Sequence, residues 1–331
     1  MSSSTSDQAM PGKTRSSFRS GVASTARVTW QQHRLALVTV AVLLAACSAF
    51  LVVQGVGMHA VYRSFGLSYA HPPRTARGVS LAETFENEYL GVGMYLPRFF
   101  MFLPLFIGTF VGGPLIAREL ETGTFRFAWT QSVGRTRWTV AKLAILGLAL
   151  TAMALAFSAL FSWWYRPFQQ LIGPATEVEG MVFAARVLLG FTLGAFAGAV
   201  LRRTVPAIAA AMVLWFAVVL PTALFLRPHF EAPLTAPVSM TSKFGTEWTL
   251  SQWWVDPHGH RLGSAAYNAL VRGLPTTDPQ SWLTAHHYVL WETFQPANRF
   301  WTFQAIEASG LCLFALALAA ATVWWVRHRA S

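Results

Sequence analysis

The sequence predicts an all-α integral membrane protein with six transmembrane helices, and three observations lead to this fold class. Hydrophobic residues make up 54% of the 331 residues and charged residues only 12%, about half the charged fraction of soluble domains. The charges are clustered, so that long stretches of the chain contain none. Six predominantly apolar stretches are near the length of about 20 residues that spans a bilayer as a helix. A soluble enzyme of this length would need a charged surface, so the composition argues against that class.

Six apolar runs are expected to form the transmembrane helices. In chain order they are Leu35–Met58, Tyr95–Ala117, Val140–Trp164, Met181–Leu201, Val205–Leu226 and Trp301–Val326. Inside a bilayer the backbone must satisfy its own hydrogen bonds, and a continuous apolar run of this length does so as a helix.

The first 27 residues are rich in Ser, Thr and Arg and poor in acids. This composition resembles a targeting peptide, but no short apolar segment with a small-residue cleavage site follows it. The run that begins at Leu35 is long enough to stay in the membrane. We therefore predict that residues 1–27 form a disordered cytoplasmic tail, and that residues 28–331 form one six-helix transmembrane domain.

The charges between the runs predict the orientation of the helices. Fourteen basic residues collect before the first run, between the second and third, between the fourth and fifth, and after the sixth: Lys13, Arg15, Arg19, Arg27, Arg34, Arg118, Arg126, Arg135, Arg137, Lys142, Arg202, Arg203, Arg327 and Arg329. The other loops, 59–94 and 227–300, contain equal numbers of basic and acidic residues. Because basic residues collect in cytoplasmic loops, both termini are expected in the cytoplasm of a bacterium, with the chain in the plasma membrane. The same rule accounts for the formal net charge of +11 better than nucleic-acid binding does.

A long extracytoplasmic loop, residues 227–300, is predicted between the fifth and sixth helices. It contains five tryptophans: Trp248, Trp253, Trp254, Trp282 and Trp291. Tryptophan favours the headgroup zone, so part of the loop is expected to lie on the outer membrane surface. Its histidines lack a recognised metal-ligand spacing, and we expect surface residues and no metal: His258, His260, His286 and His287, with Asp256 and Glu292 nearby in sequence.

The chain shows no nucleotide-binding motif of its own. Gly12-Lys13-Thr14 is similar to the end of a phosphate-binding loop, but that pattern requires a glycine where Asp7 stands. No strand precedes the tripeptide, and no apolar helix directly follows it. We expect no catalytic residues and no cofactor in this chain.

The most informative stretch is segment 118–138, between the second and third helices. It combines two acids, the helix-disfavouring Gly123, several aromatic residues and a basic end. Such a segment can lie along the membrane surface and present its acids and Trp129 to a cytoplasmic protein. An ordinary amphipathic linker has a similar composition, so composition alone leaves both interpretations open.

Segment 118–138 also resembles a known family. The pattern acid-x-Glu-Thr-Gly-Thr at 119–124, followed by Thr-Gln-Ser-Val-x-Arg-Thr-Arg-Trp at 130–138 and by Lys142, is similar to the permease subunit of type-2 ATP-binding-cassette (ABC-2) exporters, in particular its actinobacterial branch. Three further stretches agree: residues 29–34, residues 194–206, and residues 299–301 with Gln304 and Glu307. The likeness extends over most of residues 28–326 and is least diagnostic in 227–298.

The resemblance implies the ABC-2-type permease fold and a function. The chain would be the membrane-spanning subunit of an exporter that moves a small amphipathic compound, such as a drug, an antibiotic or a lipid, out of the cell. Two copies of a separate cytoplasmic ATPase subunit would bind ATP and Mg²⁺, and a second permease chain, identical or paralogous, would complete the transporter. Segment 118–138 would be the coupling loop. Its residues at the ATPase contact would be Glu119, Glu121, Thr122, Gly123, Thr124 and Trp129.

Glycines in two of the predicted helices are spaced for close packing. Gly190, Gly194 and Gly198 recur every four residues, so they share one face of the fourth helix. Small residues let helix backbones approach closely in lipid, either within one chain or between two chains, and the spacing does not separate these uses. The glycines of the second helix can mark a bend or a pore-lining surface: Gly108, Gly112 and Gly113, followed by Pro114.

Arg186 lies inside the fourth apolar run, and Glu307 lies inside the sixth. Both helices are predicted to enter from the outside, and both charges fall about six residues along them, so their depths match. An unpaired charge in the membrane costs roughly 2.5 kcal/mol or more. We therefore predict an Arg186–Glu307 ion pair near the outer leaflet. Separate extension of each side chain to the headgroups is the alternative.

Two other classes of function stay open. An intramembrane enzyme would use Glu307, Arg186 or the histidines of the long loop, but such enzymes usually bring several polar residues together at membrane depth, and Glu307 is the one acid inside the runs. A non-transporting sensor or scaffold would keep the permease fold. The resemblance favours the exporter over both.

Overall fold

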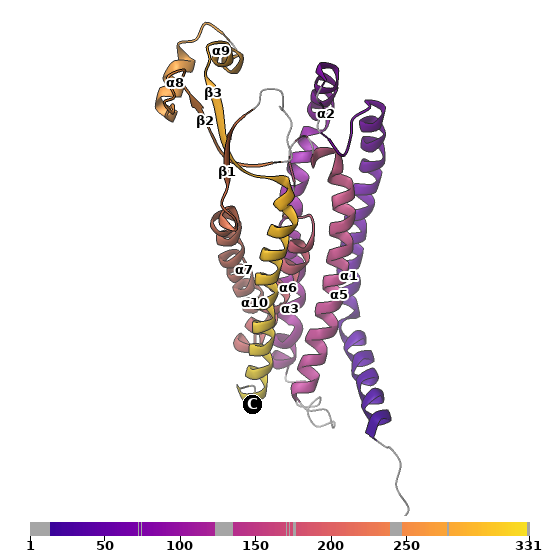
Figure 1. The fold of residues 1–331 in the computed structure, drawn as a ribbon. Helices are drawn as coiled ribbons and strands as arrows, with labels where there is room; N and C mark the ends of the chain where they lie inside the picture. Colours follow the sequence, from indigo (N-terminus) through magenta and orange to yellow (C-terminus); the bar gives the residue numbers. More distant parts are fainter. Residues whose placement is uncertain are drawn as a thin grey trace, which may run out of the picture.

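The computed structural model describes residues 14–71, 73, 75–122, 135–169, 171, 173–174, 177–238, 247–276 and 278–329. Long helices run side by side, and a small sheet stands beyond one end of the bundle that they form (Figure 1). The long helices are α1 (Thr14–Ser64), α2 (Ala76–Phe100), α3 (Leu103–Thr122), α5 (Arg135–Gln169), α6 (Met181–Leu201), α7 (Thr204–Pro221) and α10 (Phe300–Arg329).

Six helical segments among the described residues are long and apolar enough to cross a bilayer. They are His33–Ser64, Ala76–Thr122, Thr136–Gln169, Met181–Leu201, Thr204–His229 and Ala297–Arg329. Each contains one of the six apolar runs of the sequence, in the same order. The prediction of a mostly helical membrane protein with six candidate spans is thereby confirmed.

α1 extends well beyond its apolar run. Its 51 residues reach about 77 Å at 1.5 Å per residue, more than twice the thickness of a bilayer core of about 30 Å. The helix begins at Thr14, inside the segment whose composition predicts a disordered tail. Between Thr14 and Arg27 there is no proline and one glycine, so a helix already formed in the membrane can continue into this stretch at small cost. Residues 1–13 lie outside the described part of the chain.

The second span is divided into α2 and α3, with a turn at Met101 and Phe102. Charge and hydropathy predict a loop over residues 59–94, but most of this stretch is helical. α2 begins with a polar segment, and its N-cap Thr75 accepts a hydrogen bond through Oγ1 from Gly78 N at 3.1 Å. Hydropathy detects only the apolar part of such a helix. Pro104 follows the turn, in the first turn of α3, where a proline lacks no required N–H.

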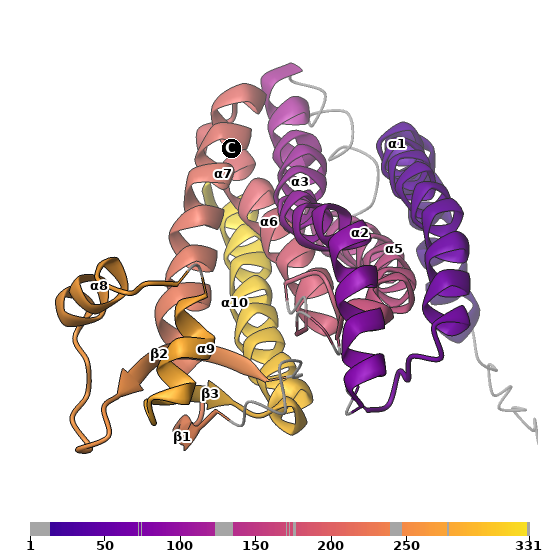
Figure 2. The same ribbon diagram turned by 90° about the horizontal axis from the view of Figure 1, so that it is seen from above.

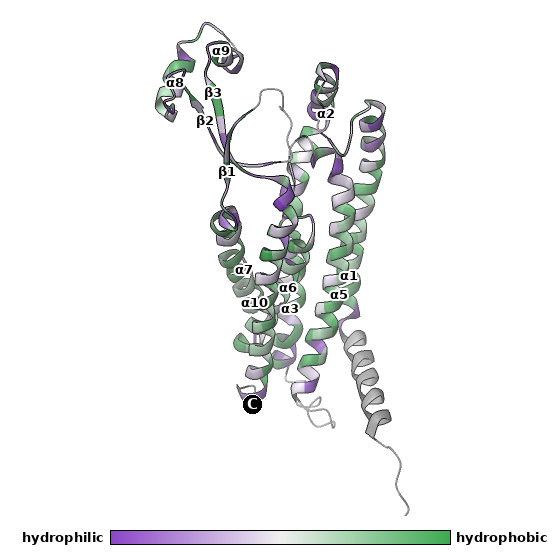
Figure 3. Cartoon of the chain, in the orientation of Figure 1, coloured by the Kyte–Doolittle hydropathy of each residue, from purple (hydrophilic) through white to green (hydrophobic). Residues whose placement is uncertain are grey.

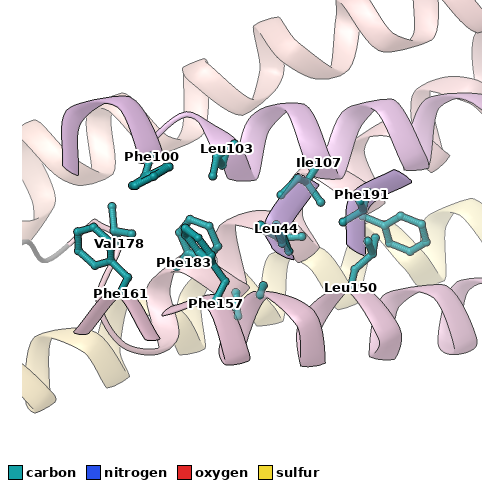
Figure 4. Close-up of a cluster of buried hydrophobic side chains, with 14 of the residues drawn as sticks. Leu44, Phe100, Leu103, Ile107, Leu150, Phe157, Phe161, Val178, Phe183 and Phe191 are labelled. Atoms are coloured by element: carbon teal, nitrogen blue, oxygen red, sulfur yellow. The ribbon is translucent and has the colours of Figure 1, made fainter. Parts of the chain in front are cut away.

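α6 lies at the centre of the bundle and packs against α3, α5, α7 and α10 (Figure 2). It is apolar on all sides, and nearly all of its residues are buried, as expected for a helix without a polar face. Aromatic rings of α2, α5 and α6 form part of the core (Figure 4). The ring of Phe157 lies 5.4 Å from Phe100 and 5.4 Å from Phe183, distances at which aromatic pairs add about 0.5–1.5 kcal/mol beyond burial.

The outward faces of the spans are apolar as well. Leu35, Val53, Val205, Phe225 and Leu313 are all more than half exposed. Figure 3 shows hydrophobic residues along most of the bundle. A water-soluble protein rarely exposes such a continuous apolar surface, whereas a bilayer covers it with acyl chains.

The all-α prediction needs a correction at residues 227–300. Strands β1 (Leu234–Pro237), β2 (Trp248–Val255) and β3 (Val289–Gln295) form an antiparallel sheet in the order β1-β3-β2. Two short helices, α8 (Ser264–Arg272) and α9 (Pro279–Ala285), lie between β2 and β3. The π-helical turn η1 (Thr222–Leu226) and the 3₁₀ turns η2 (Arg227–His229) and η3 (Ala297–Arg299) join this region to α7 and α10. Aromatic and β-branched residues favour strands, and Trp253 of β2 pairs with Trp291 of β3, so tryptophans build this sheet.

Candidate functional site

Five helix ends meet at the end of the bundle opposite the sheet, where α3 ends, α5 begins, α6 ends, α7 begins and α10 ends (Figure 1). We call this part the basic end and define it by its arginines: Arg118, Arg137, Arg202, Arg203, Arg327 and Arg329. Arg202 has a positive φ of 57° in the turn between α6 and α7. Its Nη2 donates a hydrogen bond to the carbonyl of Arg329 at 2.7 Å, which ties this turn to the end of α10.

Glu119 and Lys142 form an ion pair between the last turns of α3 and the beginning of α5. The side chain of Lys142 is 1% exposed, and its ammonium nitrogen also lies 4.0 Å from the centre of the Trp138 ring. A buried ammonium without a counter-ion would be strongly unfavourable, so the carboxylate of Glu119 is what allows Lys142 to be buried here. The pair fixes the end of α3 to α5.

Glu121 caps the beginning of α7. Its Oε2 accepts hydrogen bonds from Thr204 N at 3.2 Å and from Thr204 Oγ1 at 2.9 Å. The first backbone N–H groups of a helix have no partner within it, and the helix dipole favours a negative charge at this end. The N-cap residue Arg203 makes no side-chain capping bond, so Glu121 of α3 supplies the acceptor instead. The end of α3 is thereby fixed to α7 as well.

The other residues predicted at a partner contact are described only in part. The hydroxyl of Thr122 donates to the carbonyl of Arg118 at 2.8 Å. Gly123, Thr124 and Trp129 lie outside the described residues. Lys142 is 23 residues from Glu119, and Thr204 is 83 residues from Glu121, so neither contact could be read from local sequence spacing. Because Glu119 and Glu121 both hold partners within the chain, a displacement of the end of α3 would be passed to α5 and α7.

The glycine face of α6 packs against α3. A Cβ atom added to Gly190 would lie 3.3 Å from Gly108 Cα, and one added to Gly194 would lie 2.5 Å from Gly113 N. At Gly198 the added atom would lie 2.7 Å from the carbonyl oxygen of Gly113. Of the two uses that the spacing allows, the structure places these glycines in packing within the chain, and the glycines of the second span face them.

Arg186 and Glu307 meet in the structure. Arg186 Nη2 of α6 donates to Glu307 Oε1 of α10 at 2.6 Å, and both side chains are fully buried. Two further polar contacts hold the same region. Gln304 Oε1 of α10 accepts a hydrogen bond from Val182 N at 3.0 Å, and Trp215 Nε1 of α7 donates to the carbonyl of Arg186 at 3.1 Å. Three helices are therefore joined by polar contacts at one level.

A second arginine, not identified from the sequence, joins this pair. Arg227 of η2 places Nη1 3.6 Å from Glu307 Oε2 and 3.6 Å from Glu177 Oε1, and its guanidinium lies 5.6 Å from the Trp248 ring. It borders a cavity of about 20 Å³, enough for one water molecule that can accept hydrogen bonds from its N–H groups. We call Arg186, Arg227 and Glu307, together with the partly exposed Glu177, the buried charge cluster. The sequence does not identify Arg227 as a member of this cluster, because it directly follows an apolar run, a position typical of residues that contact lipid headgroups.

Asp256 organises a turn that contains two histidines of loop 227–300. Its Oδ1 accepts hydrogen bonds from the backbone N–H of His260 at 2.8 Å and of His258 at 2.9 Å. These bonds favour the carboxylate and lower the pKa of Asp256 below its usual value. Farther along, His286 stacks on Trp282 with 3.6 Å between ring centres. Among the residues that the structure describes, no group of three or more His, Cys, Asp or Glu side chains is placed to hold a metal ion.

The comparisons with known proteins agree with this architecture. A family model described as ABC-2 membrane transporter related matches residues 40–227, from within α1 to Arg227. This stretch contains the contacts of Glu119 and Glu121 and the packing of α6 on α3. The comparisons with curated proteins and with solved structures returned no match. The family match covers more than half of the chain, which therefore belongs to the ABC-2-related membrane transporters, a family of multi-pass, typically non-catalytic membrane subunits that partner an ABC ATPase.

Proposed function

We propose that this chain is the permease subunit of an ABC exporter that moves a small amphipathic compound out of the cell, powered by ATP hydrolysis in a separate cytoplasmic subunit. The family match and the actinobacterial-type motif in segment 118–138 support the proposal. The structural observation that carries it is the double attachment of the end of α3, through Glu119 to α5 and through Glu121 to α7.

In this proposal the basic end faces the cytoplasm, and the sheet faces the outside of the plasma membrane. The 14 basic residues that the sequence predicts on that side favour this orientation, because basic residues are retained in the cytoplasm. Both termini are then cytoplasmic, and loop 227–300 is extracytoplasmic. The transporter contains two permease chains, identical or paralogous, and two copies of the ATPase subunit. Segment 118–138 of each permease chain contacts one ATPase copy.

Glu119 and Glu121 are proposed to connect the coupling loop, segment 118–138, to helices α5 and α7. When ATP binding brings the ATPase subunits together, their motion displaces the end of α3, where segment 118–138 begins. Glu119 passes this displacement to α5 through Lys142, and Glu121 passes it to α7 through Thr204. α5 and α7 lie on different sides of α6 (Figure 2), so their combined shift changes the packing of the whole bundle and opens the space between the two permeases outward.

The buried charge cluster supports a structural role better than intramembrane catalysis. Its fully buried acid, Glu307, lies against both Arg186 and Arg227. A general acid or base must reach its substrate, and the carboxylate of Glu307 is fully buried between two guanidinium groups.

Co-purification in detergent with the ATPase encoded nearest this gene tests the proposal. Wild type is expected to retain the ATPase. Trp129→Ala is expected to retain much less of it, because the aromatic side chain of Trp129 is proposed to anchor segment 118–138 on the ATPase. Glu121→Gln and Thr204→Ala both weaken the contact between Glu121 and Thr204. Of these two residues, only Glu121 is predicted to contact the ATPase. If both variants keep the ATPase and both uncouple its hydrolysis from transport, Glu121 acts through α7.

Two other outcomes have distinct meanings. Release of the ATPase by Glu121→Gln but not by Thr204→Ala would make Glu121 a direct contact residue, as its motif implies. If the wild-type chain purifies alone with every plausible ATPase, the exporter proposal fails, and a sensor or scaffold with the permease fold becomes the better description.

A further inference from the structure

A groove opens on the side of the bundle between α5 and α10, with α6 as its floor. Its volume is about 780 Å³, within the range of roughly 300–1,000 Å³ that holds small molecules in proteins. The lining is predominantly apolar. No part of the groove belongs to the contacts of Glu119 and Glu121 or to the buried charge cluster.

Small residues on both walls create the groove. Ala144 and Gly147 face it from α5, and Ala319 and Ala320 face it from α10. A Cβ atom added to Gly147 would lie 3.4 Å from Leu188 Cδ1 and 3.6 Å from Phe191 Cε1, so the floor is formed by side chains of α6. Larger residues at these wall positions would close the space, so the small residues keep it open.

The groove opens toward the bilayer. Leu148 and Leu316 line it and are 71% and 62% exposed. Both lie within segments that are apolar enough to cross a membrane, so the medium outside the groove is hydrocarbon. An occupant must therefore have a long apolar part.

One end of the groove is basic. Arg327 and His328 line it at the end of α10, next to Trp324, whose side chain is 52% exposed. His328 Nδ1 donates to the carbonyl of Trp324 at 2.9 Å, and Arg202 holds the carbonyl of Arg329, so the end of α10 is fixed in place. Tryptophan beside basic residues is typical of the level of lipid headgroups.

We propose that an anionic phospholipid of the cytoplasmic leaflet binds in this groove, with an acyl chain along the small residues of α5 and α10 and its headgroup at Arg327 and His328. An apolar channel with the guanidinium of Arg327 and the imidazole of His328 at one end matches such a lipid, and basic pockets between transmembrane helices on the cytoplasmic side are suited to anionic headgroups. The leaflet follows from the proposed orientation, whereas the binding itself does not depend on it. The lipid joins α10 to α5.

Native mass spectrometry of the full chain in detergent tests this site, with phosphatidylglycerol and phosphatidylcholine of the same acyl chains as probes. Wild type is expected to retain phosphatidylglycerol more strongly than phosphatidylcholine. Arg327→Gln with His328→Gln is expected to reduce phosphatidylglycerol retention about fivefold or more, because removal of one arginine charge near the surface accounts for about fivefold. Arg329→Gln, a neighbouring basic residue outside the groove, is the matched control and is expected to change retention much less.

A second pair of variants tests the apolar part. Ala320→Trp fills the groove and is expected to reduce retention of both lipids, whereas Ala317→Trp adds the same bulk at an exposed position of α10 outside the groove. Thermal unfolding of each variant verifies that it is folded, and retention of the ATPase reports separately on the proposed function. Equal retention of the two lipids by wild type, or equal effects of the two tryptophans, would overturn the proposal. A third outcome would also overturn the proposal: the wild-type chain forms a dimer, and Ala320→Trp dissociates the dimer without changing lipid retention. The groove would then be an interface between two permease chains.

Discussion

At the scale of single residues, the charges inside the membrane form a shared site. Glu307 lies 2.6 Å from Arg186 and 3.6 Å from Arg227, and Glu177 lies 3.6 Å from Arg227. Two guanidinium groups and two carboxylates balance one another. In a medium with few counter-ions, removing one member leaves a buried charge unpaired, whereas removing both members of a close pair leaves a neutral, apolar contact.

Glu307→Gln is therefore expected to lower the free energy of unfolding by about 3–5 kcal/mol, because Arg186 stays buried without its carboxylate. The double variant Arg186→Met with Glu307→Met is expected to recover part of this loss, since Arg186 no longer needs a carboxylate and Arg227 keeps Glu177 at 3.6 Å as its partner. Thermal unfolding in detergent, followed by tryptophan fluorescence, measures both. Glu88→Gln, at an exposed acid of α2, is the control for loss of a carboxylate. A double variant no more stable than Glu307→Gln would show that the two charges do not compensate each other.

The sequence predicts part of this site, for a physical reason. A charge inside an apolar run is costly, so Arg186 and Glu307 stand out, and counting residues from the same membrane surface matches their depths. Arg227 and Glu177 lie at the ends of apolar runs, where charged residues are ordinary. Their part in the cluster depends on how η2 and the segment before α6 fold back over the helices, which is tertiary information.

At the scale of elements, the packing of α6 on α3 depends on glycine. The glycines of the two helices lie against one another's backbones, so the helices approach more closely than any side chain would allow. This contact positions α3, whose end carries Glu119 and Glu121. The packing of α6 is therefore linked to the geometry of the basic end.

Gly194→Ala is expected to destabilise the bundle strongly, because its Cβ would lie 2.5 Å from Gly113 N and 2.8 Å from Gly112 C, both backbone atoms that cannot turn aside. Gly310→Ala in α10 is the matched control, since a Cβ there has no neighbour within 4 Å. The control is expected to be neutral or to stabilise by up to about 1 kcal/mol, through higher helix propensity. Yield of monodisperse protein and the thermal midpoint compare the two. Similar behaviour of both variants would mean that α6 and α3 are not in such close contact.

Elements differ in how far the sequence predicts them. The fourth apolar run and α6 have the same bounds, Met181–Leu201, because the apolar residues of this helix extend over its full length. α2 is missed because its first half is polar, and helices outside the bilayer have no requirement for continuous apolar sequence. The sheet is missed because paired residues of β2 and β3 lie far apart in the chain, from Val255 with Val289 to Trp248 with Gln295, so this non-local pairing cannot be recognised from either strand alone.

At the scale of the whole molecule, charge and fold together imply one orientation. The basic end gathers the ends of α3, α5, α6 and α10, while the sheet and its short helices stand at the other end (Figure 1). Six candidate spans, an even number, agree with the proposal that both chain termini lie on one side. The orientation decides where the ATPase docks and which leaflet supplies a lipid to the groove, so it is the property on which the larger proposals depend.

Labelling with a membrane-impermeant maleimide in intact cells is expected to modify a cysteine at the sheet end and to spare one at the basic end. Cys47 and Cys312 are first replaced by alanine. A single cysteine is then introduced at an exposed position, either as Ser264→Cys or as Arg203→Cys. Ser264→Cys is expected to react in intact cells, and Arg203→Cys only after permeabilisation, because basic residues at that end are retained in the cytoplasm. Permeabilised cells, in which both thiols must react, control for accessibility. The inverse pattern would place segment 118–138 outside the cell and exclude the exporter. Labelling of both thiols in intact cells would show that the span Thr204–His229 does not place Arg203 and Ser264 on opposite sides of the membrane.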